Sequence, residues 1–265
     1  MLSAVLAAGF ALTASGLARA QSAFDTHPPV DIAITAASWT TLAILNVARS
    51  KPSPPAHCIR EACGPLGDGA MPYNRAWDVI SYVPVSLTIA GALGPSYARW
   101  WAGDASSSAA GDSTLILAEA LGVDFALTEI VKHAVPRHRP FIAYPSPHDD
   151  PARIAPDCTA SFWSGHTSAA FAAAAIGAFD ACRVDGPLGC TGPAVGLHAL
   201  AASTALMRIL AGKHHVSDVV VGAAVGSAIG SAVALTHAPK GREAVGAGHA
   251  VLGSQAVMMS MLWLW

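Results

Sequence analysis

Long apolar runs, separated by polar stretches rich in Pro and Gly, organise this chain. Six runs are each about 18 to 20 residues long, and none alternates polar and apolar positions as a half-buried β-strand does. Ala dominates several of them and is the strongest helix former. The pattern therefore predicts an all-α protein. Its helices are expected at residues 31–48, 76–93, 113–132, 161–179, 193–211 and 217–236.

The stretches outside these helices suggest how the chain is divided. An apolar segment near the N-terminus is followed by Ala18-Arg19-Ala20, a small-x-small site typical of an export signal. Residues 94–112, with a run of three Ser, are expected to form a flexible linker. The expected parts are a signal peptide (1–20), N-terminal helices and loops (21–112), a core domain (113–237) and a C-terminal tail (238–265).

Composition favours a membrane bundle but leaves a soluble one open. Charged residues make up 12% and mean hydropathy is +0.45, whereas soluble domains average about 25% charged residues. The helices are long enough to cross a hydrocarbon core of about 30 Å. Against this, Glu119, Asp124 and Glu129 point about 140° apart around the third helix, so they cannot share one interior stripe. We favour the membrane-embedded bundle; a net charge of −2 gives no reason to expect nucleic acid.

The five cysteines are compatible with an exported protein, because oxidising compartments permit disulfides. Cys58 and Cys63 lie close together in the sequence, as do Cys182 and Cys190. Two short-range bridges with Cys158 left over is the simplest expectation.

Polar residues around the later helices form three clusters. The first places Lys132 seven residues before Arg139, which Pro140 follows. A Lys ammonium supplies a point charge and an Arg guanidinium a planar fork that matches phosphate oxygens. This cluster therefore predicts binding of a phosphate-sized anion.

The second cluster, Ser164-Gly165-His166, opens the fourth expected helix. Free amides at a helix N-terminus form an anion site, and Gly165 lets the backbone come close to the anion. His166 falls in the first turn, where it could protonate a leaving oxygen.

The third cluster places Arg208 six residues before His214 and Asp218 four residues after it. One helical turn would bring the carboxylate of Asp218 to the imidazole of His214. That carboxylate would fix the tautomer and leave the other ring nitrogen free to attack. The three clusters together predict covalent phosphoryl transfer through a histidine.

Lys132-x6-Arg139-Pro140, Ser164-Gly165-His166 and Arg208-x5-His214-x3-Asp218 resemble the three-part signature of the type-2 phosphatidic acid phosphatase family. Its superfamily also contains bacterial non-specific acid phosphatases and vanadium haloperoxidases. The resemblance spans residues 113–236 and implies a six-helix bundle. Trp163 stands where the family generally has Pro, and Met207 where it has Ser, which affects the expected shape of the site.

The resemblance also implies a role for each motif residue. His214 would attack phosphorus to form a phosphohistidine, oriented by Asp218, and His166 would protonate the leaving alcohol and then activate water. The phosphoryl oxygens would be held by Lys132, Arg139, Ser164, Gly165 and Arg208. No metal or other cofactor is expected.

The sequence thus predicts an exported phosphatase of the bacterial cell envelope, with its active site facing the periplasm. A membrane bundle favours a lipid phosphate or polyprenyl diphosphate as substrate. The alternatives are a soluble periplasmic non-specific acid phosphatase acting on small phosphomonoesters, a vanadium-dependent haloperoxidase and a catalytically silent membrane scaffold.

Overall fold

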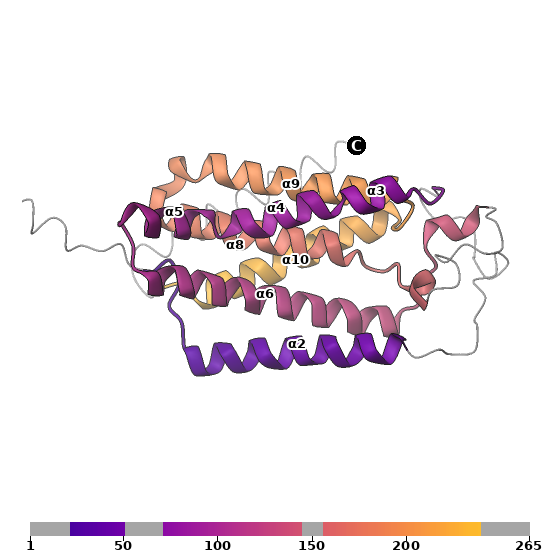
Figure 1. Ribbon diagram of the computed structural model, residues 1–265, viewed down its shortest axis with the longest axis horizontal. Coiled ribbons are helices and arrows are strands. Elements are labelled where there is room, and N and C mark those ends of the chain that lie inside the picture. Colours follow the sequence, from indigo (N-terminus) through magenta and orange to yellow (C-terminus); the bar gives the residue numbers. More distant parts are fainter. Residues whose placement is uncertain (1–21, 51–70, 145–155, 240–265) are drawn as a thin grey trace, which may run out of the picture.

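In the computed structural model, the described residues are 22–50, 71–144 and 156–239, and within these ranges the chain is helical without a β-strand (Figure 1). The prediction of an all-α fold is confirmed. The helices are α2 (Pro28–Ser50), α3 (Arg75–Ile80), α4 (Tyr82–Ala92), α5 (Gly94–Ala102), α6 (Ser107–Ala134), α8 (Gly165–Gly189), α9 (Thr191–Leu210) and α10 (Val216–Thr236), with 3-10 turns η2 (Pro140–Ala143) and η3 (Pro156–Thr159).

Each of the six expected helices has a counterpart, but the second is broken into α3 and α4. The flexible linker expected at 94–112 is wrong. Residues in its first half form α5, which has Pro in its first turn and ends at Gly103 with a φ of 82°. Ser106 belongs to the tract read as flexible, yet it caps α6 by accepting a hydrogen bond from the Ala109 amide at 3.2 Å. The expected signal peptide and most of the C-terminal tail lie outside the described residues.

The Ala-rich helix α8 lies at the centre of the bundle and packs against α10, α9, α4 and α6 (Figure 1). Its contact with α10 depends on glycines at every fourth position of α10. A Cβ atom on Gly222 would lie 2.8 Å from the carbonyl oxygen of Ser164, and one on Gly226 would clash with the backbone of Ser168. Small residues therefore bring the start of α8 close to the start of α10.

Helix α6 is covered on one side by α2 and on the other by α8 and α10 (Figure 1). Glu119, Asp124 and Glu129 point in different directions around it, as the sequence indicates, but each is buried against a neighbouring helix. Asp124 accepts a hydrogen bond from Ser168 of α8, and Glu129 pairs with Arg49 of α2 at 2.7 Å. These three acids therefore do not argue against a membrane bundle, because none of them has to face lipid.

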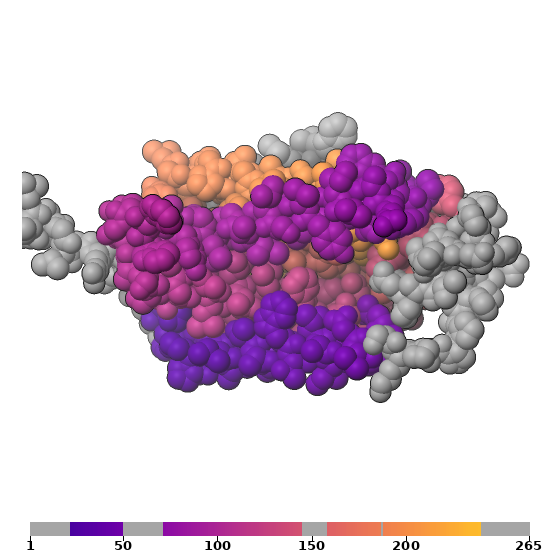
Figure 2. Space-filling model, viewed as in Figure 1, coloured from indigo at the N-terminus to yellow at the C-terminus, as the bar shows by residue number. Residues whose placement is uncertain are grey.

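Within the described part of the chain, three helices are long and apolar enough to cross a membrane: Pro28–Arg49, Thr191–Leu210 and Val216–Thr236. The helical pair Arg75–Ala92 and Gly94–Ala102, bent by 47°, is a further candidate. Helix α2 forms one outer edge of the molecule (Figure 2) and exposes Val30, Ile32, Ile44 and Val47. Such an apolar outer face is compatible with association with a membrane.

The expected disulfide between Cys182 and Cys190 is confirmed and closes the turn from α8 to α9. The expectation that Cys158 is left over is wrong, because Cys158 is also disulfide-bonded, to a partner outside the described residues. Cys58 and Cys63 lie outside them as well.

Candidate active site

The three polar clusters meet at one end of the bundle, on the right in Figure 1. Helices α6 and α9 end there, while α8 and α10 begin there. The first cluster follows α6, the second opens α8, and the third links α9 to α10. Antiparallel packing of successive helices thus brings together motifs that are far apart in the sequence.

His214 lies in the short connection between α9 and α10 and is 1% exposed. Its Nδ1 lies 2.8 Å from the carbonyl oxygen of Ser161. Because a carbonyl oxygen can only accept, Nδ1 carries the proton, and Nε2 of the neutral ring keeps a lone pair. That Nε2 lies 3.2 Å from Nη1 of Arg139, which donates to it. His214 therefore presents a nucleophilic nitrogen to a guanidinium group.

Asp218 lies beside His214, as the spacing suggested, but does not form a hydrogen bond with it. Its Oδ2 lies 3.8 Å from Nδ1 of His214, which is longer than a hydrogen bond. His214 precedes α10, which begins only at Val216. Asp218 instead caps its own helix by accepting from the His215 amide at 2.9 Å, and it also accepts from the Ser161 hydroxyl.

Arg137 also belongs to this network, although the sequence predicted no role for it in the site. Its Nη1 lies 2.5 Å from Oδ1 of Asp218 and 2.9 Å from Oγ of Ser217. Arg137 therefore neutralises the carboxylate that holds Ser161, whose carbonyl in turn holds His214. The only signal in the sequence is its position between Pro136 and Arg139 in the first cluster.

Arg139 is buried and donates to the carbonyl oxygen of Lys213 at 2.9 Å as well as to His214. Lys132, in the last turn of α6, lies 3.4 Å from Glu129. Its Nζ would be 3.7 Å from a Cβ atom placed on Gly165, so it lies beside the N-terminus of α8. Two cations of the first cluster thus adjoin the residues of the second and third.

Ser164 is the N-cap of α8, and its Oγ caps the Thr167 amide. Its own amide donates to the carbonyl oxygen of Asp218 at 3.1 Å, which fixes the start of α8 against α10. A side chain at Gly165 would come within 3.1 Å of Thr128, so the backbone is close to its surroundings here. Lys132 thus lies beside the N-terminus of α8, where the second cluster predicted an anion site.

His166 lies in the first turn of α8, with Tyr82 packed edge-on at 4.8 Å between ring centroids. Burial, followed by the charges of Arg208, Lys132 and Arg139, lowers the pKa of His166 to about 3. Burial and the charges of Arg139, Arg208 and Lys132 also hold the pKa of His214 well below its usual range. Both imidazoles are therefore neutral at pH 7 and are surrounded by the same three cations.

This arrangement agrees with a comparison of the sequence with family models. Residues 113–242 match the model described as "PAP2 superfamily". This segment belongs to the PAP2 superfamily. Neither the search of curated proteins nor that of solved structures gave a match. Membership in the PAP2 superfamily supports a phosphoric ester hydrolase in general terms.

Two side chains of the PAP2 segment form ion pairs with a residue of α3, a helix that precedes the segment. Arg208, 3% exposed at the end of α9, donates to Asp78 at 2.6 Å and to the Ser81 hydroxyl at 3.0 Å. Lys213 lies 3.6 Å from the same Asp78. The sequence predicted no function for Asp78 or for the rest of α3. The available signal was Asp78 itself, the one acid within the second apolar run.

The two departures from the family pattern lie in different surroundings. Trp163 is buried and donates from its indole Nε1 to the Thr128 hydroxyl of α6 at 2.8 Å. It therefore fixes the segment before Ser164 against α6. Met207 is half-buried on α9 directly before Arg208.

Among the described residues, one group of three side chains could hold a metal ion: Asp31, Glu119 and His237. It includes none of the residues of the three clusters.

Proposed function

We propose that this protein is a phosphatase that hydrolyses a phosphate ester through a phosphohistidine on Nε2 of His214. One observation carries the proposal: the Ser161 carbonyl holds the proton on Nδ1, so the lone pair of Nε2 is available among fixed cations. A nucleophile of this kind suits a phosphoryl group, whose charged oxygens those cations would bind.

In the first step, Nε2 of His214 attacks phosphorus, and the bond from phosphorus to the leaving oxygen breaks. Arg139 donates to Nε2 in the ligand-free protein. A bound phosphoryl oxygen would compete for that guanidinium and free the lone pair. The imidazole gains positive charge as the N–P bond forms, and Asp218 at 3.8 Å stabilises that charge without a direct hydrogen bond.

His166 would donate the proton that the leaving alkoxide needs and would then take one from water. Burial and three cations keep His166 neutral in the free protein. A phosphate anion would offset the charges of Lys132, Arg139 and Arg208 and so raise the proton affinity of His166. A substrate that binds as a monoanion brings the proton with it. In the second step, water attacks phosphorus, the N–P bond breaks and phosphate leaves.

For the substrate, we propose a lipid phosphate or polyprenyl diphosphate, handled by a membrane-embedded bundle. Support comes from three helices that could cross a membrane and from the apolar outer face of α2. The site lies at an end of the bundle, where a lipid head group would meet it (Figure 1). We further propose export to the cell envelope, with the site facing the periplasm, from the signal-like segment at 1–20.

A soluble periplasmic acid phosphatase is favoured by a different observation. Cys158 is disulfide-bonded, and its carbonyl oxygen accepts from the amide of Arg139 at the catalytic end. The Cys182–Cys190 disulfide lies where α8 meets α9, at the opposite end of the bundle (Figure 1). Disulfides persist in oxidising compartments, and the two sides of an inner membrane differ in this respect. Bonded cysteines at both ends are more simply explained if the whole bundle lies in one oxidising compartment.

Phosphate release by the purified protein in detergent, from phosphatidic acid, a polyprenyl diphosphate and p-nitrophenyl phosphate, separates these possibilities. His214→Ala is the blank, and His198→Gln, which alters a buried histidine of α9 outside the clusters, is the matched control. Release from the lipids alone supports the membrane enzyme. Release from p-nitrophenyl phosphate alone supports the soluble one. Release that persists in His214→Ala contradicts the mechanism.

A further inference from the structure

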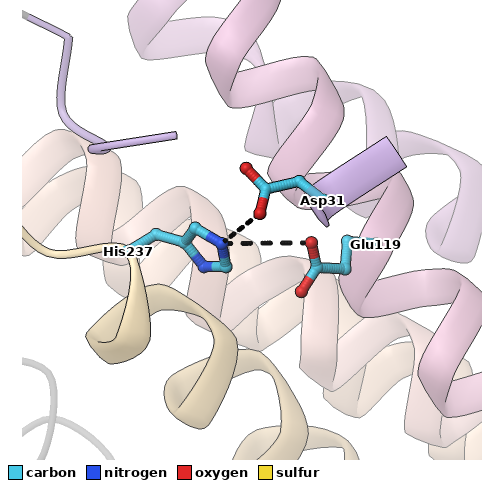
Figure 3. A group of neighbouring side chains, drawn as sticks. All are labelled: Asp31, Glu119 and His237. Atoms are coloured by element: carbon cyan, nitrogen blue, oxygen red, sulfur yellow. Dashed lines mark hydrogen bonds and ion pairs between the residues drawn. The ribbon is translucent and has the colours of Figure 1, made fainter. Parts of the chain in front are cut away.

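A second polar cluster lies at the opposite end of the bundle from His214. It consists of Asp31 in the first turn of α2, Glu119 in α6 and His237 directly after α10 (Figure 3). At 1.5 Å per residue, Glu119 is about 20 Å along α6 from Lys132. The cluster therefore cannot touch a phosphoryl group bound at the catalytic end.

The three side chains point toward a common centre (Figure 3). Nε2 of His237 lies 3.2 Å from Oδ1 of Asp31 and 4.0 Å from Oε2 of Glu119, and the three ligand atoms lie within 4.8 Å of one another. All three residues are buried: Asp31 is 2%, Glu119 4% and His237 8% exposed. Two carboxylates thus share a small buried volume, which is unfavourable without a cation between them.

Glu119 supplies an independent sign that a ligand is needed. Its Oε2 faces the centre of the cluster and has no hydrogen-bond partner within the described part of the chain. A buried carboxylate oxygen left unsatisfied costs about 1–3 kcal/mol or more. Coordination to a metal ion would satisfy it.

The hydrogen bonds of His237 point to the same conclusion. Its Nδ1 lies 2.8 Å from the carbonyl oxygen of Val233, so Nδ1 carries the proton. Nε2 then faces two carboxylate oxygens, so the charge there is balanced either by a second proton on the ring or by a metal ion between the three side chains. Histidine ligands of metal ions characteristically donate their other ring N–H to a carbonyl or carboxylate.

Asp31 is oriented in a comparable way. Its Oδ2 accepts a hydrogen bond from the His27 amide at 2.7 Å, which leaves Oδ1 directed at His237. The second oxygen is therefore fixed by the backbone, as is common for carboxylates that coordinate metals.

We propose that Asp31, Glu119 and His237 bind a divalent transition-metal ion, with Zn²⁺ as the best match, in a structural site. One imidazole and two carboxylates suit Zn²⁺, whereas Mg²⁺ and Ca²⁺ prefer oxygen ligands alone. Tetrahedral bonds of about 2.0–2.1 Å place neighbouring ligand atoms about 3.3 Å apart. The 3.2 Å spacing already fits, and the 4.0 Å spacing requires a small inward shift of Glu119.

The ion would have a mechanical role rather than a catalytic one. Its two positive charges would balance the two carboxylates, and water could fill a fourth coordination position. The ligands come from α2, α6 and the end of α10, so the ion would join the outermost helix to the bundle. Removal of the ion should therefore lower thermal stability and leave phosphoryl transfer intact below the melting temperature.

The test uses full-length protein purified without a metal-affinity column, stripped with EDTA and dialysed into metal-free buffer. Zn²⁺ binding is measured by competition with a chromophoric chelator, and metal content by mass spectrometry of the dialysed complex. Co²⁺ replaces Zn²⁺ in a parallel sample, because its visible absorption reports coordination geometry. The variants are Glu119→Gln and Asp31→Asn. Asp124→Asn is the matched control, since Asp124 is a buried acid of the same helix outside the cluster.

The expected result is about one Zn²⁺ per chain in the wild-type protein, with a higher melting temperature in its presence. Affinity should fall at least about tenfold in Glu119→Gln and Asp31→Asn and should remain in Asp124→Asn. Absence of stoichiometric binding of Zn²⁺, Co²⁺ or Mn²⁺ to the wild type overturns the proposal. So does equal binding by the wild type and whichever cluster variant folds, as judged by circular dichroism. In either case a proton, not a metal ion, bridges the three side chains.

Discussion

Nδ1 of His214 donates its hydrogen bond to the backbone carbonyl of Ser161, at 2.8 Å. The tautomer of the proposed nucleophile is therefore fixed by a main-chain group, which no side-chain substitution removes. The Ser161 hydroxyl is in turn bound to Asp218, which pairs with Arg137. Asp218 thus acts on His214 through Ser161 and through its charge.

This relationship predicts the effect of Asp218→Asn. The amide keeps the size of the side chain but removes the negative charge 3.8 Å from Nδ1 of His214. We expect kcat to fall about 10²-fold through the lost stabilisation of the imidazolium, with KM changed little. Steady-state kinetics on the best substrate of the panel measures both. An increase in KM with kcat unchanged would show that Asp218 serves substrate binding instead.

Arg139→Lys tests the planar guanidinium. One Nη atom of Arg139 serves both the Lys213 carbonyl and Nε2 of His214. A lysine ammonium is a point charge without the planar pair of nitrogens that would bind two phosphoryl oxygens, so we expect kcat/KM to fall about 10²-fold. Inhibition by vanadate, which mimics five-coordinate phosphorus, should weaken in parallel.

The control for that variant is Arg99→Lys. Arg99 pairs with the buried Asp180 at 2.8 Å in a part of the bundle formed by α5 and α8. We expect its kcat/KM to match that of the wild type. Equal losses in both variants would mean that the effect is on folding and not on the site.

The depressed pKa values of the two histidines predict an unusual titration. Burial together with Arg208, Lys132 and Arg139 lowers the pKa of His166 to about 3, so its ring should stay neutral as pH falls from 8 to 5. The pKa of His214 is also lowered, and its ring should likewise stay neutral in that interval. NMR of histidine-labelled protein in detergent should show neither ring titrating in this range.

The same three positive charges determine the direction in which a bound anion shifts the pKa of His166. Vanadate offsets the three cations, so it should raise the pKa of His166. In Lys132→Met, one of the depressing charges is absent, and the pKa of His166 should rise even without ligand. Titration of either ring with an ordinary midpoint in the free wild-type protein would contradict the geometry of the site.

Gly226→Ala tests the close approach of α8 and α10. A Cβ atom at this position would clash with the Ser168 backbone, one turn after Ser164. We expect a loss of about 1–3 kcal/mol in the free energy of unfolding, because neither helix can move away freely. Activity should fall as well, since the start of α8 shifts.

Gly196→Ala, in α9, is the matched control, because a Cβ atom there meets nothing within 4 Å. It should stabilise the helix by up to about 1 kcal/mol, since Ala is the better helix former. Chemical denaturation of both variants gives the comparison. Equal free energies of unfolding for Gly226→Ala and Gly196→Ala would show that α8 and α10 do not depend on a glycine at their contact.

The sequence predicted the features that depend on local patterns. Apolar runs indicated the helices, and the spacing of charged residues indicated the motifs that meet around His214. What it missed depends on where helices start. The spacing of His214 and Asp218 correctly brought the carboxylate near the ring, at 3.8 Å from Nδ1, but His214 precedes α10 and its Nδ1 donates to the Ser161 carbonyl instead. Periodicity does not reveal which backbone carbonyl lies beside a side chain in the connection between two helices.

Pairings between distant segments were equally invisible. Arg208 and Asp78 form an ion pair across 130 positions of sequence, and His237 contacts Asp31 across 206. Glu119, Asp124 and Glu129 argued against a membrane-embedded helix because the sequence does not reveal which helices cover each side. Tertiary packing supplied Arg49 for Glu129 and Ser168 for Asp124.

The most direct test of the account is to trap the phosphohistidine in His166→Ala with p-nitrophenyl phosphate. Its leaving group needs no proton, so the first step should proceed, while the second lacks the base that activates water. We predict a burst of about one p-nitrophenolate per enzyme and a base-stable, acid-labile phosphoryl group mapped to His214 by mass spectrometry. A burst or label that persists when His214→Ala is added, or turnover without any phosphorylated histidine, would contradict the account.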